Sequence, residues 1–409
     1  MPEYLAPGVH VEEVSFKSKP IEGLSTSTAG FVGPCRSGPT GGELKLLTSF
    51  YDFECIYGMT DSLHFGDIKS SVHNYLAYAV RAFFKEGGKR CYVARIANGS
   101  SGKTGIENQP TPADYEGTET LVNGVVTKTG LRSFEELDDI SIVAAPGATF
   151  NFANLGGVDH TEAINRCLIS HCEKMRYRVA VIDSVKEHDL NKVQNYRSNF
   201  NSAYAALYYP WITSVDPITR KKIDVPPSGT ISGIYARVDS ERGVHKAPAN
   251  EEIYSANGLE FDINKAQQSI LNPLGINCLR YFKRRGYRVW GARTVSSDPE
   301  WKYINVRRYF AYLEQSIERG TQWSVFESNG AVLWNKVRQS IEDFLFNEWE
   351  HGRLAGAKPE EGYHVRCDRT TMTQDDIDNG RLVCMIGVAP VKPAEFVIFR
   401  IEQKTQERA

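Results

Sequence analysis

Short apolar runs alternate with amphipathic stretches between residues 140 and 209, and this alternation limits the chain to few folds. Ile140–Ala144, residues 179–182 and Ala205–Tyr209 are runs of small, β-branched or aromatic residues, as is typical of strands buried on both faces. Residues 161–173 have helical spacing, and residues 186–196 predict a weaker helix. This order of strands and helices predicts an α/β fold, with a parallel sheet covered by helices on both faces.

The neighbouring residues extend the same pattern. Residues 29–33 predict a first core strand, residues 75–84 a helix that stops before a Gly-Gly pair, and residues 90–96 a second strand. Residues 98–130 are rich in Gly, Thr, Asn and Pro without a sustained period, so we expect a long and mostly irregular excursion. Proline-containing turns bracket a surface hairpin between residues 216 and 227.

The last third of the chain has a different character, which begins near Ile276. Asp298 and Pro299 fit the N-cap and the first position of a helix that Gly320 would end. Residues 329–351 predict a second helix with one apolar face. The end of the chain is rich in predicted strands, at residues 381–388 and 396–401.

Size and composition indicate an ordinary globular protein. The 409 residues favour two or three folding units, and 41% hydrophobic and 24% charged residues argue against a disordered chain. The formal net charge of −2 gives no reason to expect a nucleic-acid partner or an anionic membrane. Residues 1–4 lack the features of a secretory signal and no run is long enough to span a bilayer, so we expect cytoplasmic assembly without membrane insertion.

The eight cysteines form no CxxC pair, and most of them lie inside apolar segments. A cytosolic chain of this size seldom depends on a disulfide framework. We therefore interpret the cysteines as small buried hydrophobic residues.

A phosphate-binding loop is the sharpest enzymatic candidate. Residues 97–104 (ANGSSGKT) follow a predicted strand and fit a loose P-loop with Lys103 as its lysine, and Asp183 ends a strand that could present a magnesium ligand. A P-loop, however, places phosphate at the N-terminus of a helix, and Pro110 and Pro112 leave no amphipathic helix after Lys103. A Gly/Ser-rich loop explains the same residues, so we favour it over a P-loop NTPase.

Two patterns suggest metal sites. His160, Cys167, His171 and Cys172 lie on or beside one predicted helix, but Cys172 points away from the face that Cys167 and His171 share, so a core helix with two buried cysteines is favoured over zinc. Residues 375–380 (DDIDNG) resemble a calcium loop whose frame puts an isoleucine at a ligand position, so a turn with a helix N-cap is the better interpretation. No metal and no cofactor are expected.

Catalysis has no positive support in the sequence. No GxSxG elbow is present, and the nine histidines show no triad pattern. We therefore expect a protein that is not an enzyme and has no catalytic residues.

Blocks of sequence near both ends and through the second half resemble contractile phage-tail sheath proteins. They occur in the expected order over nearly the whole chain, and in detail they are similar to sheath subunits of extracellular contractile injection systems, the phage-tail-like particles. The blocks are residues 4–14 (YLAPGVHVEEV), 26–33 (TSTAGFVG), 243–250 (GVHKAPAN), 271–277 (LNPLGIN), 290–294 (WGART), 297–301 (SDPEW), 367–374 (CDRTTMTQ) and 389–396 (APVKPAEF).

The resemblance implies an architecture and a function. The expected fold is an outer subtilisin-like α/β domain, an inner α+β sheath domain, and extended terminal arms that exchange strands between subunits. We place the boundaries at residues 1–20 for the N-terminal arm, 21–275 for the α/β region, 276–393 for the inner domain and 394–409 for the C-terminal arm. The implied function is that of a structural subunit whose sheath contracts to drive an inner tube into a target envelope.

The implied partners follow from this assembly. The chain would bind copies of itself in stacked hexameric rings, the inner tube protein, baseplate and tail-terminator proteins, and any sheath paralogues. The particle would assemble in the cytoplasm and could be released outside the cell. The alternatives are a non-contracting tail or baseplate component and, from the motif above, a P-loop NTPase.

The residues themselves also support strand exchange. Residues 396–401 form a nearly all-apolar terminal strand with no hairpin partner after it, and such a strand would be an aggregation hazard unless another subunit's sheet pairs with it. The expected strand-exchange residues are Val9, Val11, Val14, Phe396, Val397, Ile398, Phe399 and Ile401. The expected hinges of the two arms are Pro20, Gly23, Pro390 and Pro393.

Overall fold

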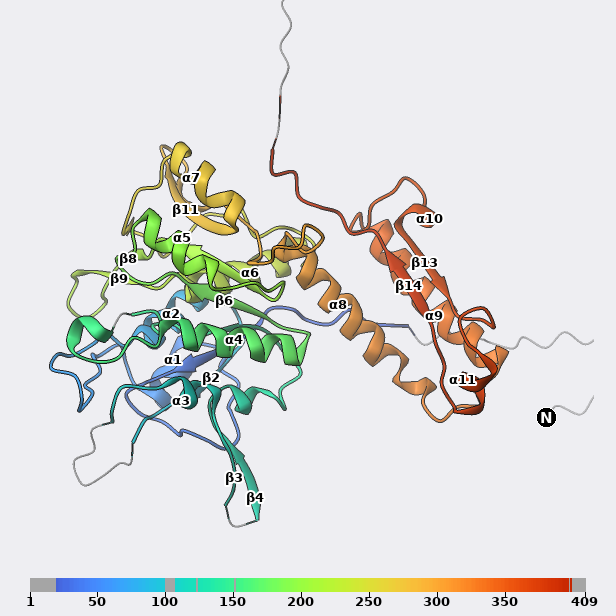
Figure 1. Cartoon of the computed structure of the whole chain (residues 1–409), viewed down its shortest axis with the longest axis horizontal. Helices are drawn as coiled ribbons and strands as arrows, with labels where there is room; N and C mark the ends of the chain where they lie inside the picture. The colour runs from blue at the N-terminus through green and yellow to red at the C-terminus, as the bar shows by residue number, and fades with distance from the viewer. Residues whose placement is uncertain (1–19, 100–106, 123, 151, 397, 399–409) are drawn as a thin grey trace, which may run out of the picture. The chain divides into compact units, whose positions relative to one another are not determined.

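The computed structural model of the chain describes residues 20–99, 107–122, 124–150, 152–396 and 398 (Figure 1). The chain divides into two units. The α/β unit contains Leu24–Gln315 and the residues from Pro390 onward, and the C-terminal unit contains Ser316–Ala389 together with the chain up to Gly23.

A seven-stranded sheet with the order β12-β11-β7-β6-β5-β1-β2 forms the centre of the α/β unit. Neighbouring strands are parallel, except that β12 is antiparallel to β11, so the predicted parallel sheet is confirmed. The strands are β1 (Thr28–Gly33), β2 (Cys91–Arg95), β5 (Ile140–Ala144), β6 (Val179–Asp183), β7 (Ala205–Tyr209), β11 (Ile276–Phe282) and β12 (Gly286–Val289).

Helices cover both faces of this sheet, as the sequence predicted. Along β1, Phe31 belongs to the apolar core on one face and Val32 to the core on the other. The first core includes residues of α1 (Phe50–Tyr57), α2 (Tyr75–Lys85) and α6 (Ser228–Arg242). The second includes residues of α4 (Thr161–Met175), α5 (Leu190–Ser198) and α7 (Lys265–Leu271).

The sheet extends past the expected domain boundary. We placed that boundary between residues 275 and 276, but β11 begins at Ile276 and pairs in parallel with β7, with Ile276 opposite Leu207. The structure instead divides the chain between Gln315 and Ser316. The reason is that the backbone of β11 is hydrogen-bonded into the central sheet, which sequence character alone does not reveal.

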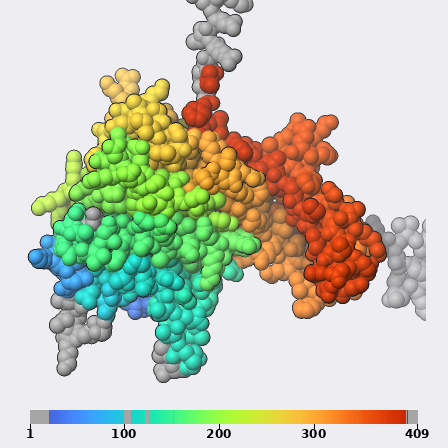
Figure 2. Space-filling model, in the orientation of Figure 1, coloured from blue at the N-terminus to red at the C-terminus, as the bar shows by residue number. Residues whose placement is uncertain are grey.

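Residues 98–130 are more regular than expected. They include α3 (Pro112–Glu116) and an antiparallel hairpin of β3 (Glu119–Val122) and β4 (Val125–Lys128), in which Leu121 pairs with Val126. This hairpin stands out from the α/β unit in Figures 1 and 2. Glycine, asparagine and proline are depleted in strands, and the pairing of two short strands compensates for them.

Smaller elements complete the α/β unit. The predicted surface hairpin is present as β8 and β9, and β10 joins it to make a three-stranded sheet. These elements are β8 (Ile212–Val215), β9 (Lys222–Val225), β10 (Gly258–Leu259) and the 3-10 turns η1 (Gly130–Phe134), η2 (Phe152–Leu155) and η3 (Asn272–Leu274).

The C-terminal unit is built on one long helix and a small sheet. Helix α9 (Ala331–Glu350) buries the predicted apolar face, including Trp334 and Phe344, and a two-stranded antiparallel sheet of β13 and β14 follows it. Helix α8 (Ile304–Thr321) belongs to the α/β unit up to Gln315 and to this unit from Ser316. The other bounds are η4 (Gln322–Ser324), α10 (Pro359–Gly362), β13 (Tyr363–Arg366), α11 (Gln374–Asp378) and β14 (Met385–Val388). In the part of the chain that the structure describes, no helix is both long and apolar enough to cross a bilayer.

The predicted start of helix α8 is wrong. Asp298 and Pro299 lie in a loop, and the helix begins only at Ile304. The amide of Thr294 donates to the carbonyl of Lys302 at 3.0 Å, and Ile304 donates to Ala292 at 3.0 Å. These long-range backbone bonds hold the segment in a non-helical conformation, in spite of its local N-cap signal.

Helix α6 was not predicted because it lacks an apolar stripe. Its residues from Ser228 to Val238 are all buried, so hydrophobic periodicity is absent. It crosses α2 at very short range, because a Cβ atom on Gly229 would lie 2.5 Å from the Cα atom of Ala79 and one on Gly233 would lie 2.6 Å from the carbonyl oxygen of Phe83. The two glycines, four residues apart, allow this close approach.

We predict that Gly229→Ala destabilises the α/β unit, although alanine is the better helix former by about 1 kcal/mol. The added methyl group must push the backbone of α2 away, so the free energy of unfolding should fall by about 1–3 kcal/mol in urea denaturation. Ser240→Ala, at an exposed position of the same helix, should change it by less than about 0.5 kcal/mol. Equal effects of the two substitutions would contradict the close crossing.

Candidate functional site

The carboxylate of Glu395, next to the predicted C-terminal arm strand, is held by four side chains of the α/β unit. Arg293 donates from Nε to Oε1 at 2.9 Å and from Nη2 to Oε2 at 2.7 Å. Asn272 Nδ2 donates to Oε1 at 2.7 Å, and the hydroxyl of Tyr303 donates to Oε2 at 3.0 Å. Lys302 Nζ lies 3.5 Å from Oε2. These contacts, which we call the Glu395 clamp, fix the chain just before residue 396.

The sheet core orients the arginine of the Glu395 clamp. Asn277, fully buried on β11, accepts a hydrogen bond from the Arg293 amide at 2.7 Å and donates to the Arg293 carbonyl at 2.8 Å. Its amide nitrogen also donates to the carbonyl of Leu207 on β7 at 3.1 Å. Gly291 makes this approach possible, because a Cβ atom there would lie 2.8 Å from the Asn277 side-chain oxygen. The Glu395 clamp is therefore continuous with the central sheet.

The electrostatics of the clamp favour the charged carboxylate. Burial alone would raise the pKa of Glu395, but the hydrogen bonds from Arg293 and Asn272 and the charge of Arg293 outweigh it and lower that pKa to about 2. Arg293 is itself only 8% exposed, so removing the carboxylate would leave a buried guanidinium without its anion.

The chain becomes exposed directly after the Glu395 clamp. Phe396 is 71% exposed and Ile398 is 81% exposed. The other predicted residues of the arm strand, Val397, Phe399 and Ile401, lie outside the described residues. The order of residues is thus a fixed carboxylate followed at once by two exposed apolar side chains, Phe396 and Ile398.

The predicted hinges of the C-terminal arm lie between its two fixed points. Ala389 still belongs to the C-terminal unit, where its amide donates to the carbonyl of Gly362 at 2.8 Å. Pro390 and Pro393 lie between Ala389 and Glu395, in a stretch with no helix. Any hinge motion of these prolines stays a prediction.

A buried apolar contact holds the other end of the chain in the C-terminal unit. Val9, Val11 and Val14 lie outside the described residues, whereas Pro20 and Gly23 are exposed. Ile21 between them is buried, and a Cβ atom on Gly320 of α8 would lie 2.6 Å from its side chain. Gly320 therefore does not end the helix, which continues to Thr321, but makes room for Ile21.

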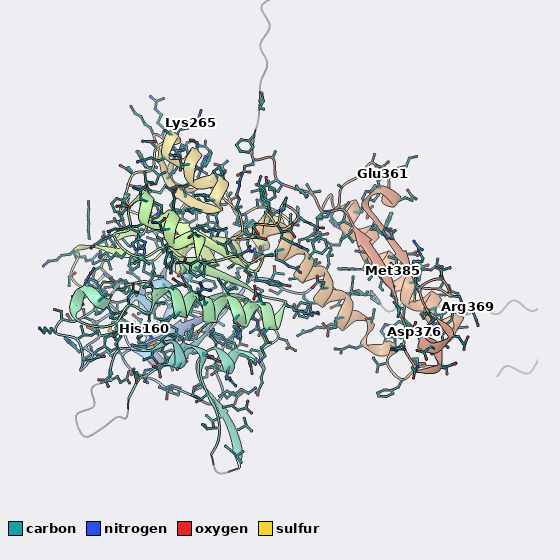
Figure 3. All side chains as sticks on the ribbon, viewed as in Figure 1. His160, Lys265, Glu361, Arg369, Asp376 and Met385 are labelled. Atoms are coloured by element: carbon teal, nitrogen blue, oxygen red, sulfur yellow. The ribbon has the colours of Figure 1, made fainter. Side chains whose placement is uncertain are left out.

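The small sheet of the C-terminal unit has open apolar positions. The exposed fractions of Met385 and Ile386 on β14 are 52% and 37%. The described residues give this sheet two strands, so each strand has one edge without a paired strand. Met385 is labelled on β14 in Figure 3. An edge with exposed apolar side chains can accept a further strand.

The phosphate-loop candidate falls mostly outside the described residues, Lys103 included. On either side of this gap, the Asn108 amide donates to the Asn98 carbonyl at 2.9 Å. The magnesium candidate Asp183 on β6 is separated from β2 by two strands, or about 14 Å. Its carboxylate instead accepts from the Ser228 amide at 2.7 Å and from the Ser228 hydroxyl at 2.6 Å.

The four residues considered for a zinc site have different surroundings. His160, labelled in Figure 3, is the N-cap residue of α4, Cys172 is in the core, and the Cys167 sulfur lies 3.9 Å from the Pro112 carbonyl. His171 contacts Arg178 at 3.1 Å, and burial together with that charge lowers the pKa of His171 to about 3. Among the residues that the structure describes, no group of three or more His, Cys, Asp or Glu side chains could hold a metal.

The acidic run from Asp375 forms the predicted helix cap. The hydroxyl and amide of Thr373 donate to Asp376 at 2.7 and 3.0 Å, while the Asp376 amide donates back to the Thr373 hydroxyl at 3.2 Å. This reciprocal arrangement is the capping box at the start of α11. Arg381 pairs with Asp375 at 2.8 Å, so the acidic side chains are already engaged.

The Glu395 clamp was not predicted, although both of its main residues lie in blocks that resemble the sheath family. Arg293 belongs to WGART and Glu395 to APVKPAEF, about a hundred positions apart. The signal that could have indicated the contact was one arginine in the first block and one glutamate, of opposite charge, in the second. Nothing in the sequence alone showed that they meet.

We expect that Glu395→Gln loosens residues 390–396. The substitution leaves Arg293 buried without a counter-charge, so amide hydrogen exchange in this segment, followed by mass spectrometry, should be about tenfold faster or more. Glu300→Gln removes a carboxylate from an exposed neighbouring loop and should leave the exchange unchanged. Unchanged exchange in the Glu395 variant would show that the clamp does not hold the segment.

The same clamp should weaken in acid. Because the folded pKa of about 2 lies below the ordinary value of 4.5, the carboxylate contributes fully above about pH 5 and loses its contribution as the pH falls from 4.5 toward 2. Exchange of residues 390–396, corrected for the intrinsic pH dependence, should rise over this window in the wild-type chain. The Glu395→Gln chain should show no such rise.

Comparisons with known proteins identify the family. Residues 108–295 match the phage tail sheath protein central domain, and residues 296–404 match the phage tail sheath C-terminal domain. The tail sheath protein of Escherichia phage P2 is 23% identical over 340 residues, which cover 82% of this chain and 81% of that protein. A prophage major tail sheath protein of Pseudomonas aeruginosa is 24% identical over 251 residues, and this match covers 60% of this chain and 62% of the relative.

Solved structures extend the similarity to the whole chain. The contracted sheath complex of the PVC extracellular contractile injection system has a TM-score of 0.74 and 28% identity, with 100% of both chains covered. The contracted helical sheath of the anti-feeding prophage has a TM-score of 0.73 and 28% identity, covering 98% of this chain and 100% of that one. The chain belongs to the phage tail sheath protein family.

Proposed function

We propose that the chain is the structural subunit of a contractile sheath in a phage-tail-like injection particle. Copies stack as hexameric rings around an inner tube, and shortening of the sheath drives the tube into a target envelope. The similarity to two contracted sheaths over essentially the whole chain supports this function. Baseplate and tail-terminator proteins would close the two ends of the sheath, which would assemble in the cytoplasm before release.

The observation that carries the proposal is the change at Glu395 from a side chain held by hydrogen bonds to an exposed apolar side chain at the next residue. The residue is clamped by a bidentate arginine, and Phe396 immediately after it is exposed. A single chain gains nothing from presenting an apolar strand at a fixed point. An assembled sheath gains a connection, because the strand can bury its side chains and pair its backbone in a neighbouring subunit.

The C-terminal unit offers the acceptor for this strand. Its β13–β14 sheet has an unpaired edge and exposed apolar residues, namely Met385 and Ile386. In the assembly, the arm of one copy would add to this edge in another copy, and the N-terminal arm with Val9, Val11 and Val14 would do the same. The unit contains residues from both parts of the chain that border the arms, which supports its assignment as the inner domain. The α/β unit is then the outer, subtilisin-like domain.

Contraction would move these parts without refolding them. The sheet of the α/β unit is packed on both faces, and packed cores resist continuous deformation. Pro20, Gly23, Pro390 and Pro393 lie beside the fixed residues Ile21 and Glu395, so they can absorb the change in direction. The extended sheath would be the metastable state, and new contacts between outer domains would release the stored energy.

We predict that deletion of residues 396–409 leaves a folded, soluble subunit that cannot build a sheath. Glu395 is retained, so the Glu395 clamp stays closed and circular dichroism and thermal melting should stay near wild type. The lost strand supplies backbone hydrogen bonds of about 0.5–1.5 kcal/mol each and buried Phe and Ile side chains of about 1.5–3 kcal/mol each at every junction. Ile398→Pro is a milder version that removes one ladder donor.

Electron microscopy of the overexpressed protein distinguishes the outcomes of this deletion. Absence of sheath tubes with unchanged melting supports the arm as the connector. Long sheaths from the truncated chain would contradict it. Loss of the folded state would show that the strand belongs to its own subunit.

The acceptor edge can be tested on its own. Ile386→Lys places a charge where the neighbour's apolar strand would pack, so sheath formation should fail. The free energy of unfolding of the isolated subunit should change by less than about 1 kcal/mol. Val332→Lys, at a 68% exposed position of α9 in the same unit, is the matched control and should assemble normally. If both variants assemble, β14 is not the acceptor edge.

A second candidate is a baseplate component that does not contract. A protein in the anti-feeding prophage baseplate structure also resembles this chain, with a TM-score of 0.70 and 29% identity. Abundance separates the two functions, because a sheath subunit should be the major protein of purified particles. In either case we expect no hydrolytic activity, because Asp183 is engaged by Ser228 and Asn108 turns back next to Asn98.

A further inference from the structure

Two of the eight cysteines lie side by side at the end of the β13–β14 sheet. Arg366 of β13 pairs with Met385 of β14, so the next position of the same antiparallel register places Cys367 opposite Cys384. Each thiol is the largest influence on the pKa of the other, as expected for side chains at opposite positions of the ladder. Both are present as free cysteines. This pairing could not be predicted from the sequence, because the two residues form no CxxC motif and lie 17 positions apart in the chain.

The backbone geometry at this position suits a disulfide. The Ala389 amide donates to the Gly362 carbonyl at 2.8 Å, so Gly362 and Ala389 are a hydrogen-bonded pair of the ladder. Pairs alternate along an antiparallel ladder, which makes Cys367 and Cys384 a non-hydrogen-bonded pair. Their Cα atoms are then expected about 4.5 Å apart, inside the range of about 4.4–6.8 Å that disulfides accept.

The surroundings of the pair favour a thiolate on Cys367. The hydrogen bond from Cys384 lowers the pKa of Cys367, and the charge of Arg338 on α9 lowers it further, against burial and Asp368. The same contact and burial raise the pKa of Cys384. Cys367 is 2% exposed and Cys384 is partly exposed, so a small oxidant can reach the pair through Cys384.

We propose that Cys367 and Cys384 are a redox-active pair that closes to an intramolecular disulfide when its surroundings become oxidising. Glutathione keeps such a pair reduced in the cytosol, and a glutathione disulfide pool oxidises it elsewhere. The bond closes residues 368–383, with Arg369, Asp376 and α11, into a covalent loop beside the small sheet (Figure 3). This inference concerns the chemistry of the C-terminal unit and does not depend on the proposed function.

The reaction balances as two exchanges with glutathione disulfide. Cys367, whose pKa is lowered, first loses its proton to solvent, and its thiolate then takes the proton of Cys384. The Cys384 thiolate attacks one glutathione sulfur, which forms a mixed disulfide and releases one glutathione thiolate. Cys367 then loses its proton to solvent and displaces the second glutathione thiolate. Two protein thiols are oxidised, glutathione disulfide is reduced, and the two released thiolates take up the two protons.

The exposed thiol of Cys55 provides an internal control. The full chain is incubated with glutathione disulfide, its remaining thiols are alkylated, and it is digested with trypsin without reduction. Cys55 should carry a glutathione adduct, because it is exposed and lies on α1, outside the β13–β14 ladder that places Cys367 opposite Cys384. The peptide containing Cys367 should instead be joined directly to the peptide containing Cys384. Alkylated or separately glutathionylated Cys367 and Cys384, under conditions that modify Cys55, would overturn the proposal.

Stability provides a second readout. Oxidation should raise the thermal midpoint of the wild-type C-terminal unit by about 5 °C or more, because the closed loop has less entropy to gain on unfolding. Cys55→Ser should show the same rise and Cys384→Ser should show none. An equal rise in Cys384→Ser would contradict the disulfide. If Cys384→Ser does not fold, Cys384→Ala takes its place, and the peptide measurement on the wild-type chain decides the matter without any variant.

Discussion

Burial of the parallel sheet on both faces is the constraint on which the rest of the structure depends. Parallel strands need crossover connections, and each crossover helix must cover one of the two apolar faces. This requirement explains why α2 and α6 pack on one face while α4 and α5 pack on the other. It also explains the glycines of α6, because a helix enclosed by the sheet and by α2 has no room for larger residues at the crossing.

The same core determines where the chain leaves the α/β unit. Asn277 ties β11 to β7 and to the backbone of Arg293, and Arg293 holds Glu395. A residue near the end of the sequence is thus fixed by a continuous set of hydrogen bonds from the sheet. In the C-terminal unit, the contact of Ile21 with Gly320 has the same effect on the N-terminal side. The proposed exchange of arms would use this division between a fixed base and the segment that follows it.

Much of the fold could be predicted from the sequence where buried apolar residues recur at the spacing of a helix or form the short runs of a strand. The strands from Ile140 to Tyr209 and the helices α2, α4 and α9 follow the expected residues closely. Prediction failed where distant residues decide the local conformation. Asp298 and Pro299 form a good helix start, but backbone bonds from Thr294 and Ala292 hold this segment in a loop until Ile304.

The sequence by itself determined the parallel α/β core and the apolar segments at both ends, because these depend on residue type and spacing along the chain. For the same reason it argued against a complete metal-binding or nucleotide-binding motif. Only the tertiary structure decided that Arg293 meets Glu395 and that Cys367 meets Cys384. These contacts join residues from different strands and loops. Their energy comes from geometry and from exclusion of water, and both exist only once the sheets are assembled.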